Sequence, residues 1–176
     1  VRMVFFFFSV SAISHAAISP ESVAVLYNSS VPESRKLAEL YRDTRGIPAE
    51  NLIALDMPIT ADISRADFDQ AILKPLRGEF EKRNWWKRQR DAAGVKLPVA
   101  NKIHVLVTMR GVPLRIQPTP KPAPKPEDPP PDPQNPVAGH DEASVDSELA
   151  LFGVEELPTE GILQNKFYKS TKSIAD

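Results

Sequence analysis

The chain has 176 residues, enough for one ordinary domain with a hydrophobic core, and it carries 22 basic against 23 acidic side chains. A net charge of −1 provides no global attraction to nucleic acid or to an anionic membrane. The sequence contains no cysteine, which excludes disulfides, a thiol nucleophile and thiolate metal sites within these residues.

The first 16 residues have the pattern of a secretory signal peptide. Arg2 precedes a short apolar run, and Ser14 and Ala16 place small residues at the two positions that signal peptidase reads. The run is too short for a comfortable membrane span. We therefore predict cleavage after Ala16 and an exported protein, periplasmic or extracellular, with no membrane span after cleavage.

Residues 22–28 predict a first strand, and an amphipathic helix is expected to follow it. Ser30 and Glu33 are spaced as a capping box, and Pro32 is tolerated in the first turn of a helix. Gly46 then provides a residue that can adopt the left-handed conformation at the end of the helix.

A second strand is expected over residues 51–55, before another helix. Ser64 and Asp67 form a second candidate capping box, and Pro75 is expected to kink the helix that they open. Apolar residues four apart mark the buried stripe of this helix, namely Phe68, Ile72, Leu76 and Phe80.

Residues 103–109 form an unbroken apolar run, which predicts a third strand buried on both faces. Alternating strands and helices predict a three-layer α/β sandwich with a mostly parallel sheet. We assign residues 17–116 to the first half of this domain and residues 140–176 to its continuation. Three strands leave sheet edges uncovered, so we expect the fold to be incomplete at the C-terminus and the chain to be truncated.

Residues 117–139 contain ten prolines in 23 positions. Such a segment has few backbone donors for a sheet and few apolar side chains to bury, so we predict a flexible, extended insertion. A short helix is expected beyond it, over residues 143–152.

Several blocks of the sequence resemble the N-terminal part of an uncharacterised family of exported bacterial proteins, found in species that carry exosortase and the PEP-CTERM sorting system. The blocks are residues 25–30, 38–51, 63–68, 111–116 and 144–149. The resemblance implies a location in the cell envelope or outside the cell. It implies no mechanism, because the family has no established activity.

A weaker, architectural likeness is to the α/β domains of gingipain and caspase type. In those proteases a His and a Cys act from the ends of later strands. This chain has no Cys and no His at a matching strand end, so no catalytic residue can be carried over. The catalytic residues are unknown.

The candidate site follows from the strand order. If the first and third strands are neighbours, Asn28, Ser29 and Ser30 lie near Arg110, at the sheet edge where ligands of parallel sheets bind. These groups could hold an anion such as a carboxylate or phosphate. Alternatively, Asn28 and Ser30 only turn and cap the chain, and Arg110 pairs with a surface acid.

Asp146 and Ser147 are further candidates for ligand binding, because they form the polar centre of one family-like block. Asp146 also belongs to a cluster with His140, Asp141, Glu142 and Glu148, whose imidazole and carboxylates could hold a metal. Acidic residues are equally favoured at a helix start by the helix dipole, so we predict no metal and no cofactor.

Two adjacent indoles, Trp85 and Trp86, stand among basic residues and could contact a sugar or a partner protein. The alternative is that they anchor a helix onto the sheet. His104 is expected to be a core residue.

The sequence therefore predicts an exported binding or assembly component of a bacterial envelope or extracellular system linked to exosortase sorting. Its partner is unknown, with polysaccharide or protein as the options and nucleic acid excluded. The alternative is an N-terminal fragment of a caspase-like or gingipain-like hydrolase whose catalytic residues lie beyond Asp176. Whether the protein is an enzyme stays open at this point.

Overall fold

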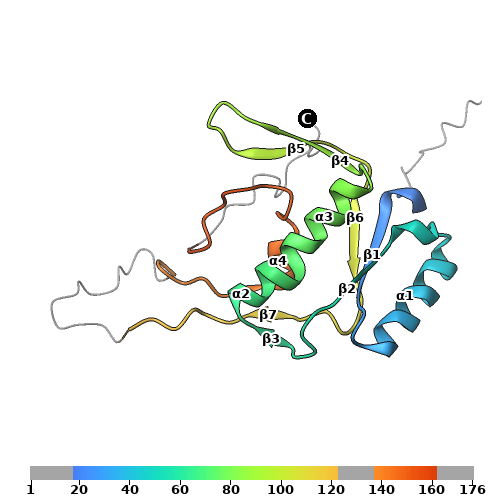
Figure 1. The fold of residues 1–176 in the computed structure, drawn as a ribbon, viewed down its shortest axis with the longest axis horizontal. Helices are drawn as coiled ribbons and strands as arrows, with labels where there is room; N and C mark the ends of the chain where they lie inside the picture. The colour runs from blue at the N-terminus through green and yellow to red at the C-terminus, as the bar shows by residue number, and fades with distance from the viewer. Residues whose placement is uncertain (1–17, 123–136, 162–176) are drawn as a thin grey trace, which may run out of the picture.

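The computed structural model describes residues 18–122 and 137–161 as a mixed α/β fold (Figure 1). The predicted signal peptide and most of the proline-rich segment lie outside the described residues. The elements, in chain order, are η1 (Pro20–Ser22), β1 (Val23–Asn28), α1 (Pro32–Arg45), η2 (Ala49–Asn51), β2 (Leu52–Leu55), β3 (Asp62–Ile63), α2 (Arg65–Asp67), η3 (Phe68–Leu73), α3 (Lys74–Lys82), β4 (Trp86–Arg90), β5 (Lys96–Asn101), β6 (Val105–Thr108), β7 (Arg115–Ile116), β8 (Ala143–Ser144) and α4 (Val145–Leu149).

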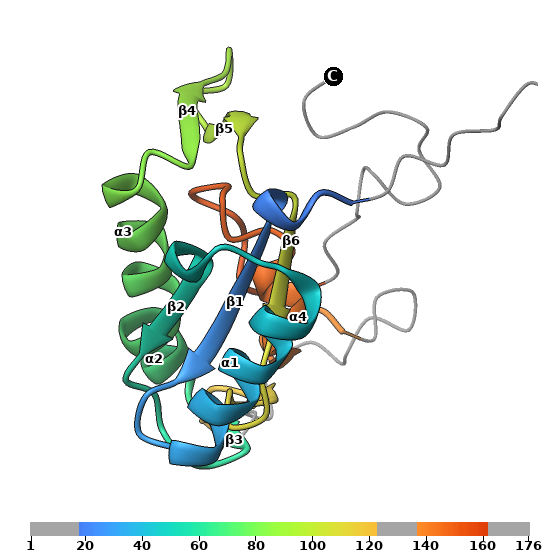
Figure 2. The same cartoon turned by 90° about the vertical axis from the view of Figure 1, so that its right-hand side faces the viewer.

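The main sheet has the order β2-β1-β6, and all of its strands are parallel (Figure 2). β1 lies in the middle, with Val25 opposite Leu52 on one side and opposite Val107 on the other. Successive side chains of a strand point to opposite faces, so Val25 faces one apolar layer while Ala24 and Leu26 face the other. The predicted parallel pairing of the three strands is confirmed.

Helix α1 covers one face of the sheet, through contacts of Ala38 with Val25 and Ile47. Gly46 ends the helix in the left-handed conformation, with φ 63°, as the sequence predicts. The predicted capping box at its start is wrong. The N-cap is Val31, and the Ser30 hydroxyl instead donates to Asp56.

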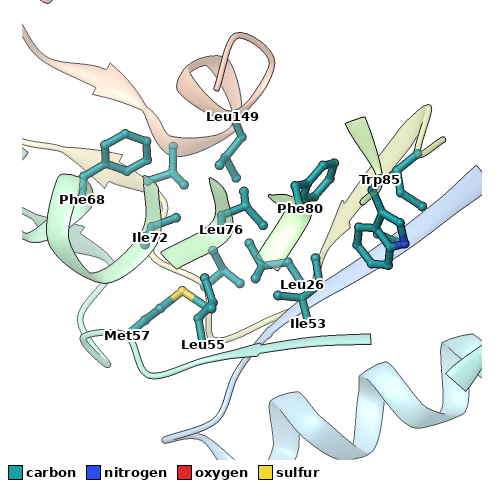
Figure 3. Packing of buried hydrophobic residues seen from close by; sticks show 14 of the residues in the cluster. Leu26, Ile53, Leu55, Met57, Phe68, Ile72, Leu76, Phe80, Trp85 and Leu149 are labelled. Atoms are coloured by element: carbon teal, nitrogen blue, oxygen red, sulfur yellow. The ribbon is translucent and has the colours of Figure 1, made fainter. Parts of the chain in front are cut away.

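The other face is covered by α2, η3 and α3, which follow one another as a continuous helical segment (Figure 3). The predicted capping box is confirmed, since Ser64 Oγ accepts from Asp67 N at 3.0 Å and Asp67 Oδ2 accepts from Ser64 N at 3.3 Å. The irregularity expected at Pro75 is found as a π-helical turn, η3, directly before it. Proline lacks the N–H of a regular helical turn, which favours such a local rearrangement.

The segment after α3 forms an antiparallel hairpin of β4 and β5, which the sequence analysis did not identify. Trp85 and Trp86, at its base, are only 3% and 8% exposed. Their rings lie 5.1 Å and 5.0 Å from that of Phe80, and the Arg88 guanidinium covers Trp86 at 4.6 Å. Of the two readings that the sequence left open for the indoles, the structure favours the anchoring one, because both are core side chains packed against Phe80 of α3.

Strand β6 is shorter than predicted and is not buried on both faces. It spans Val105–Thr108, and each of these residues is half-buried, because among the described residues β6 pairs only with β1. Its place at the edge of the sheet accounts for the difference. His104, expected in the core, is exposed at the start of this strand.

A second small sheet joins segments that are distant in sequence. β3 pairs parallel with β7, and β7 pairs antiparallel with β8. Arg65 Nη2 also donates to the Asp141 carbonyl at 2.7 Å, and Arg65 Nη1 lies 3.0 Å from Glu148. These contacts hold α4 against the helical face. The described helices include none whose length and apolar character would allow it to cross a bilayer.

Removing the Phe80 ring tests the helical face of the core. Phe80 is 1% exposed and contacts both indoles and Phe152, so Phe80→Ala should lower the free energy of unfolding by about 3 to 5 kcal/mol. Leu40→Ala, at a 64% exposed position, should change it by less than about 0.5 kcal/mol. Urea unfolding followed by tryptophan fluorescence measures both, and equal losses would contradict this packing.

The pH dependence of stability tests the hydrogen bonds between Thr119 and the Asp141 carboxylate. Asp141 accepts hydrogen bonds from Thr119 N (2.9 Å) and Oγ1 (2.5 Å), which lower the pKa of this carboxyl below its ordinary value. A lowered folded-state pKa contributes stability above the unfolded-state pKa, and that contribution is lost as the pH falls through the folded-state value. Asp141→Asn should therefore lower the melting temperature at pH 7, and the gap to the wild type should close below about pH 3.9.

Asp43→Asn, at an exposed position of α1, is the control for general charge effects. A gap for Asp141→Asn that stays constant from pH 7 to pH 3 would contradict a role for the charged carboxylate.

Candidate functional site

A cleft of about 520 Å³ opens where β6 ends. Its walls come from four parts of the chain: the start of α1, the loop before β3, the loop after β6 and the start of α4. The lining residues are Val31, Glu33, Ile59, Thr60, Ala61, Thr108, Met109, Arg110, Gly111, Val112, Pro113, Leu114 and Asp146. This is the carboxyl-terminal edge of a parallel sheet, where the sequence predicts a site.

Asn28, the last residue of β1, holds the loops around this edge together. Its side chain is fully buried, and Nδ2 donates to the carbonyl oxygens of Met57 (3.1 Å), Pro58 (3.2 Å) and Gly111 (2.9 Å). Oδ1 accepts from Ser30 N at 3.0 Å and from Met57 N at 3.3 Å. The amide is thus fully engaged with the backbone, so Asn28 positions the cleft rather than lining it.

Gly111 allows the loop after β6 to approach α1 closely. Its φ of 104° lies in a region that residues with a side chain rarely adopt. A Cβ atom at this position would come 3.1 Å from Ser34 Cβ and 3.3 Å from Val31 Cβ. Ser34 in turn accepts a hydrogen bond from Asn28 N at 3.1 Å, so the glycine and the asparagine brace the same corner.

The structure brings Arg110 and Asp146, two of the predicted site residues, into this one cleft. Arg110 arrives from the end of β6 and Asp146 from the first turn of α4. Neither forms an ion pair with any residue in the described ranges, and Asp146 accepts only a hydrogen bond from Thr108 Oγ1 at 3.3 Å. Glu33 adds a second carboxylate, so the cleft presents one cation and two anions.

Much of the remaining lining is apolar. Ile59 and Leu114 are 75% and 64% exposed, although both are large hydrophobic residues. Sequence reasoning missed them, because no pattern distinguishes an exposed leucine after a strand from a core residue. In the sequence, the available indication for Leu114 is that it lies in block 111–116, one of the blocks on which the resemblance to exported bacterial proteins rests.

The other predicted site residues do not line the cleft. Ser29 N donates to the Leu55 carbonyl at 2.8 Å, and Ser30 bonds Asp56, so both face the end of β2. Ser147 Oγ donates to the Ser144 carbonyl at 2.8 Å, within the start of α4. Their predicted role in ligand binding stays a prediction.

Within residues 18–122 and 137–161, no three His, Asp or Glu side chains gather as a metal ion requires. The side chains of His140 and Glu142 form a hydrogen bond of 2.8 Å with each other. The Asp141 carboxylate accepts a hydrogen bond from Thr119. The cleft, in contrast, combines side chains of both charges with apolar walls.

No family model, curated protein or solved structure matches the chain. The assignment of a role therefore depends on the geometry of the cleft.

Removing the Asn28 amide tests its role in shaping the cleft. Asn28→Ala leaves the carbonyl of Gly111 and the amide of Met57 without their partners, so the free energy of unfolding should fall by about 2 to 4 kcal/mol. Ser29→Ala, at the exposed neighbouring position, should change it by less than about 0.5 kcal/mol. Chemical denaturation measures both. A loss below 0.5 kcal/mol for Asn28→Ala, roughly the surface-residue level, would contradict the bracing role.

Proposed function

We propose that the protein is an exported binding or assembly component of a bacterial envelope or extracellular system linked to exosortase sorting, and that it binds its partner in the cleft at the end of β6. The observation that carries the proposal is that Arg110 and Asp146 line the same apolar-walled cleft. Neither side chain forms an ion pair among the described residues.

The composition of the cleft favours a polypeptide partner. A cleft for nucleic acid carries an excess of cations, whereas the described lining of this one has Arg110 together with the carboxylates of Glu33 and Asp146. Polypeptide segments offer both signs of charge, backbone donors and acceptors, and apolar side chains. A polysaccharide partner is less favoured, because Trp85 and Trp86 are buried and the cleft lining contains no aromatic ring.

Two features of the sequence support the location. The first 16 residues carry the signal-peptide pattern, and the family-like blocks resemble exported proteins of exosortase-bearing species. One of these blocks, 111–116, contributes four residues to the cleft lining, namely Gly111, Val112, Pro113 and Leu114.

In this proposal the full architecture is a three-layer α/β sandwich with a mostly parallel sheet. The order β2-β1-β6, with the first strand in the middle, supports it, because this is the start of a doubly wound order.

The same strand order favours the alternative function, a caspase-like or gingipain-like hydrolase. The described residues bring no Cys and His together at the cleft, as a caspase-like or gingipain-like site requires: His104 lies at the opposite end of β6, and the sequence has no Cys. The alternative therefore requires catalytic residues beyond Asp176.

Removing the Arg110 guanidinium tests the proposed function. Arg110→Ala should reduce the retention of the purified chain on the envelope fraction of an exosortase-bearing bacterium by about tenfold, because the cation that lines the cleft is lost. Arg35→Ala removes another arginine, which pairs with Glu39 on α1 and does not line the cleft, and should leave retention unchanged. Sedimentation with the fraction measures both, and equal retention of wild type and Arg110→Ala would contradict the proposal.

A further inference from the structure

Helix α4 has five residues, Val145–Leu149, too few to form a stable helix alone, so its orientation depends on contacts with the rest of the chain. Val145 and Leu149 are 1% and 6% exposed and belong to the apolar cluster of the helical face (Figure 3). Val145 N also donates to the Leu114 carbonyl at 3.0 Å. These contacts attach α4 to the body of the fold. Its rotation about its own axis depends on the side chains that flank the two buried residues.

Two carboxylates flank the buried side of α4, one on each side. Successive residues of a helix are turned by about 100°, so Asp146 and Glu148 lie about 80° to either side of the buried stripe. Asp146 lines the cleft, where it accepts a hydrogen bond from Thr108 Oγ1 at 3.3 Å. Glu148, on the opposite flank, lies 3.0 Å from Arg65 Nη1. The rotation of α4 is therefore set by one contact on each flank.

The contact made by Arg65 is the stronger of the two. Its side chain is only 13% exposed, and Nη2 donates to the Asp141 carbonyl at 2.7 Å while Nη1 faces Glu148. The guanidinium also lies 5.7 Å from the centroid of the Phe68 ring. A planar guanidinium that engages two acceptors at once holds them in a fixed geometry. The hydrogen bond of 3.3 Å on the cleft side is longer than is usual between two oxygen atoms, and it is exposed.

We infer that Arg65 is a positioning residue of the cleft: through Glu148 it sets the rotation of α4, and α4 in turn places the Asp146 carboxylate in the cleft. Arg65 itself does not line the cleft. Resting on the proposed function, this assigns to Arg65 the placement of the carboxylate that meets cationic groups of the polypeptide partner. Without Arg65 the buried residues still attach α4 to the core, but the Asp146 carboxylate is free to turn out of the cleft.

Chemical crosslinking between β6 and α4 tests the inference without a partner. The chain has no native cysteine, so in a variant with Thr108→Cys and Asp146→Cys a short bifunctional thiol reagent joins only these two positions. Adding Arg65→Met should slow the joining about fivefold, because α4 no longer holds residue 146 beside β6. Mass spectrometry measures the rate. A monofunctional thiol reagent, applied to each single-cysteine variant, controls for changes in accessibility.

Arg77 provides the matched control on the same helical face. Its Nε and Nη2 donate to the carbonyl oxygens of Phe152 (2.7 Å) and Val154 (2.8 Å), which follow α4. Arg77→Met therefore removes a similar guanidinium that has no hydrogen bond to α4, and it should leave the joining rate within about twofold of that of the parent cysteine pair. The melting temperatures of the variants show whether the two substitutions destabilise the fold to a similar extent.

Two further variants separate the ion pair from a general loss of stability. Arg65→Lys keeps a cation beside Glu148 and should restore most of the joining rate. Glu148→Gln removes the same ion pair from the side of α4, at a partly exposed position, and should slow the joining as Arg65→Met does. Glu148→Gln therefore serves as the test if Arg65→Met fails to fold.

Retention on the envelope fraction connects the positioning role to the proposed function. Asp146→Asn and Arg65→Met should each reduce retention about fivefold, and the double variant should lose no more than either alone, because Arg65 acts through Asp146. Losses that multiply in the double variant overturn the inference, as does a joining rate that is unchanged in Arg65→Met and Glu148→Gln or equally slowed in Arg77→Met. If the joining slows as expected but Arg110→Ala is retained like the wild type, the proposed function fails while the positioning of α4 by Arg65 stands.

Discussion

The hydrogen bonds of the Asn28 side chain hold together three of the four segments that shape the candidate site, all but the start of α4. They join the end of β1 to the segment after β2 and to the loop after β6, through Met57 and Gly111. A buried amide is stable only when its donors and acceptors are satisfied, and here the partners are backbone groups from three distant segments. The position of the loops therefore depends on one side chain that itself touches no ligand surface.

The central position of β1 explains why the fold tolerates so small a sheet. Its alternate residues serve two apolar layers, one against α1 and one against α3, so each helix has a buried face although the sheet has three strands. The aromatic group around Phe80 extends the second layer to the β4–β5 hairpin. These layers fix β6 in place beside β1, where its end opens into the cleft.

The cleft brings together charged side chains from three distant parts of the chain. Glu33 comes from α1, Arg110 follows β6 and Asp146 lies in the first turn of α4. Their mixed charges, together with the apolar walls, are the physical basis for proposing a polypeptide ligand in preference to a small anion or a nucleic acid.

The sequence was sufficient for the order of the main strands and helices, for the cap at Gly46 and the capping box at Ser64, and for placing Arg110 at a sheet edge, because these follow from local periodicity and backbone preference. It misplaced Ser30, it left open whether the two indoles are buried, and it missed the hairpin. Those features depend on contacts between distant segments: Ser30 with Asp56, Trp86 with Phe152. Only packing in three dimensions decides whether an apolar residue such as Leu114 is buried or lines a cleft, because burial belongs to the assembled layers and not to the residue.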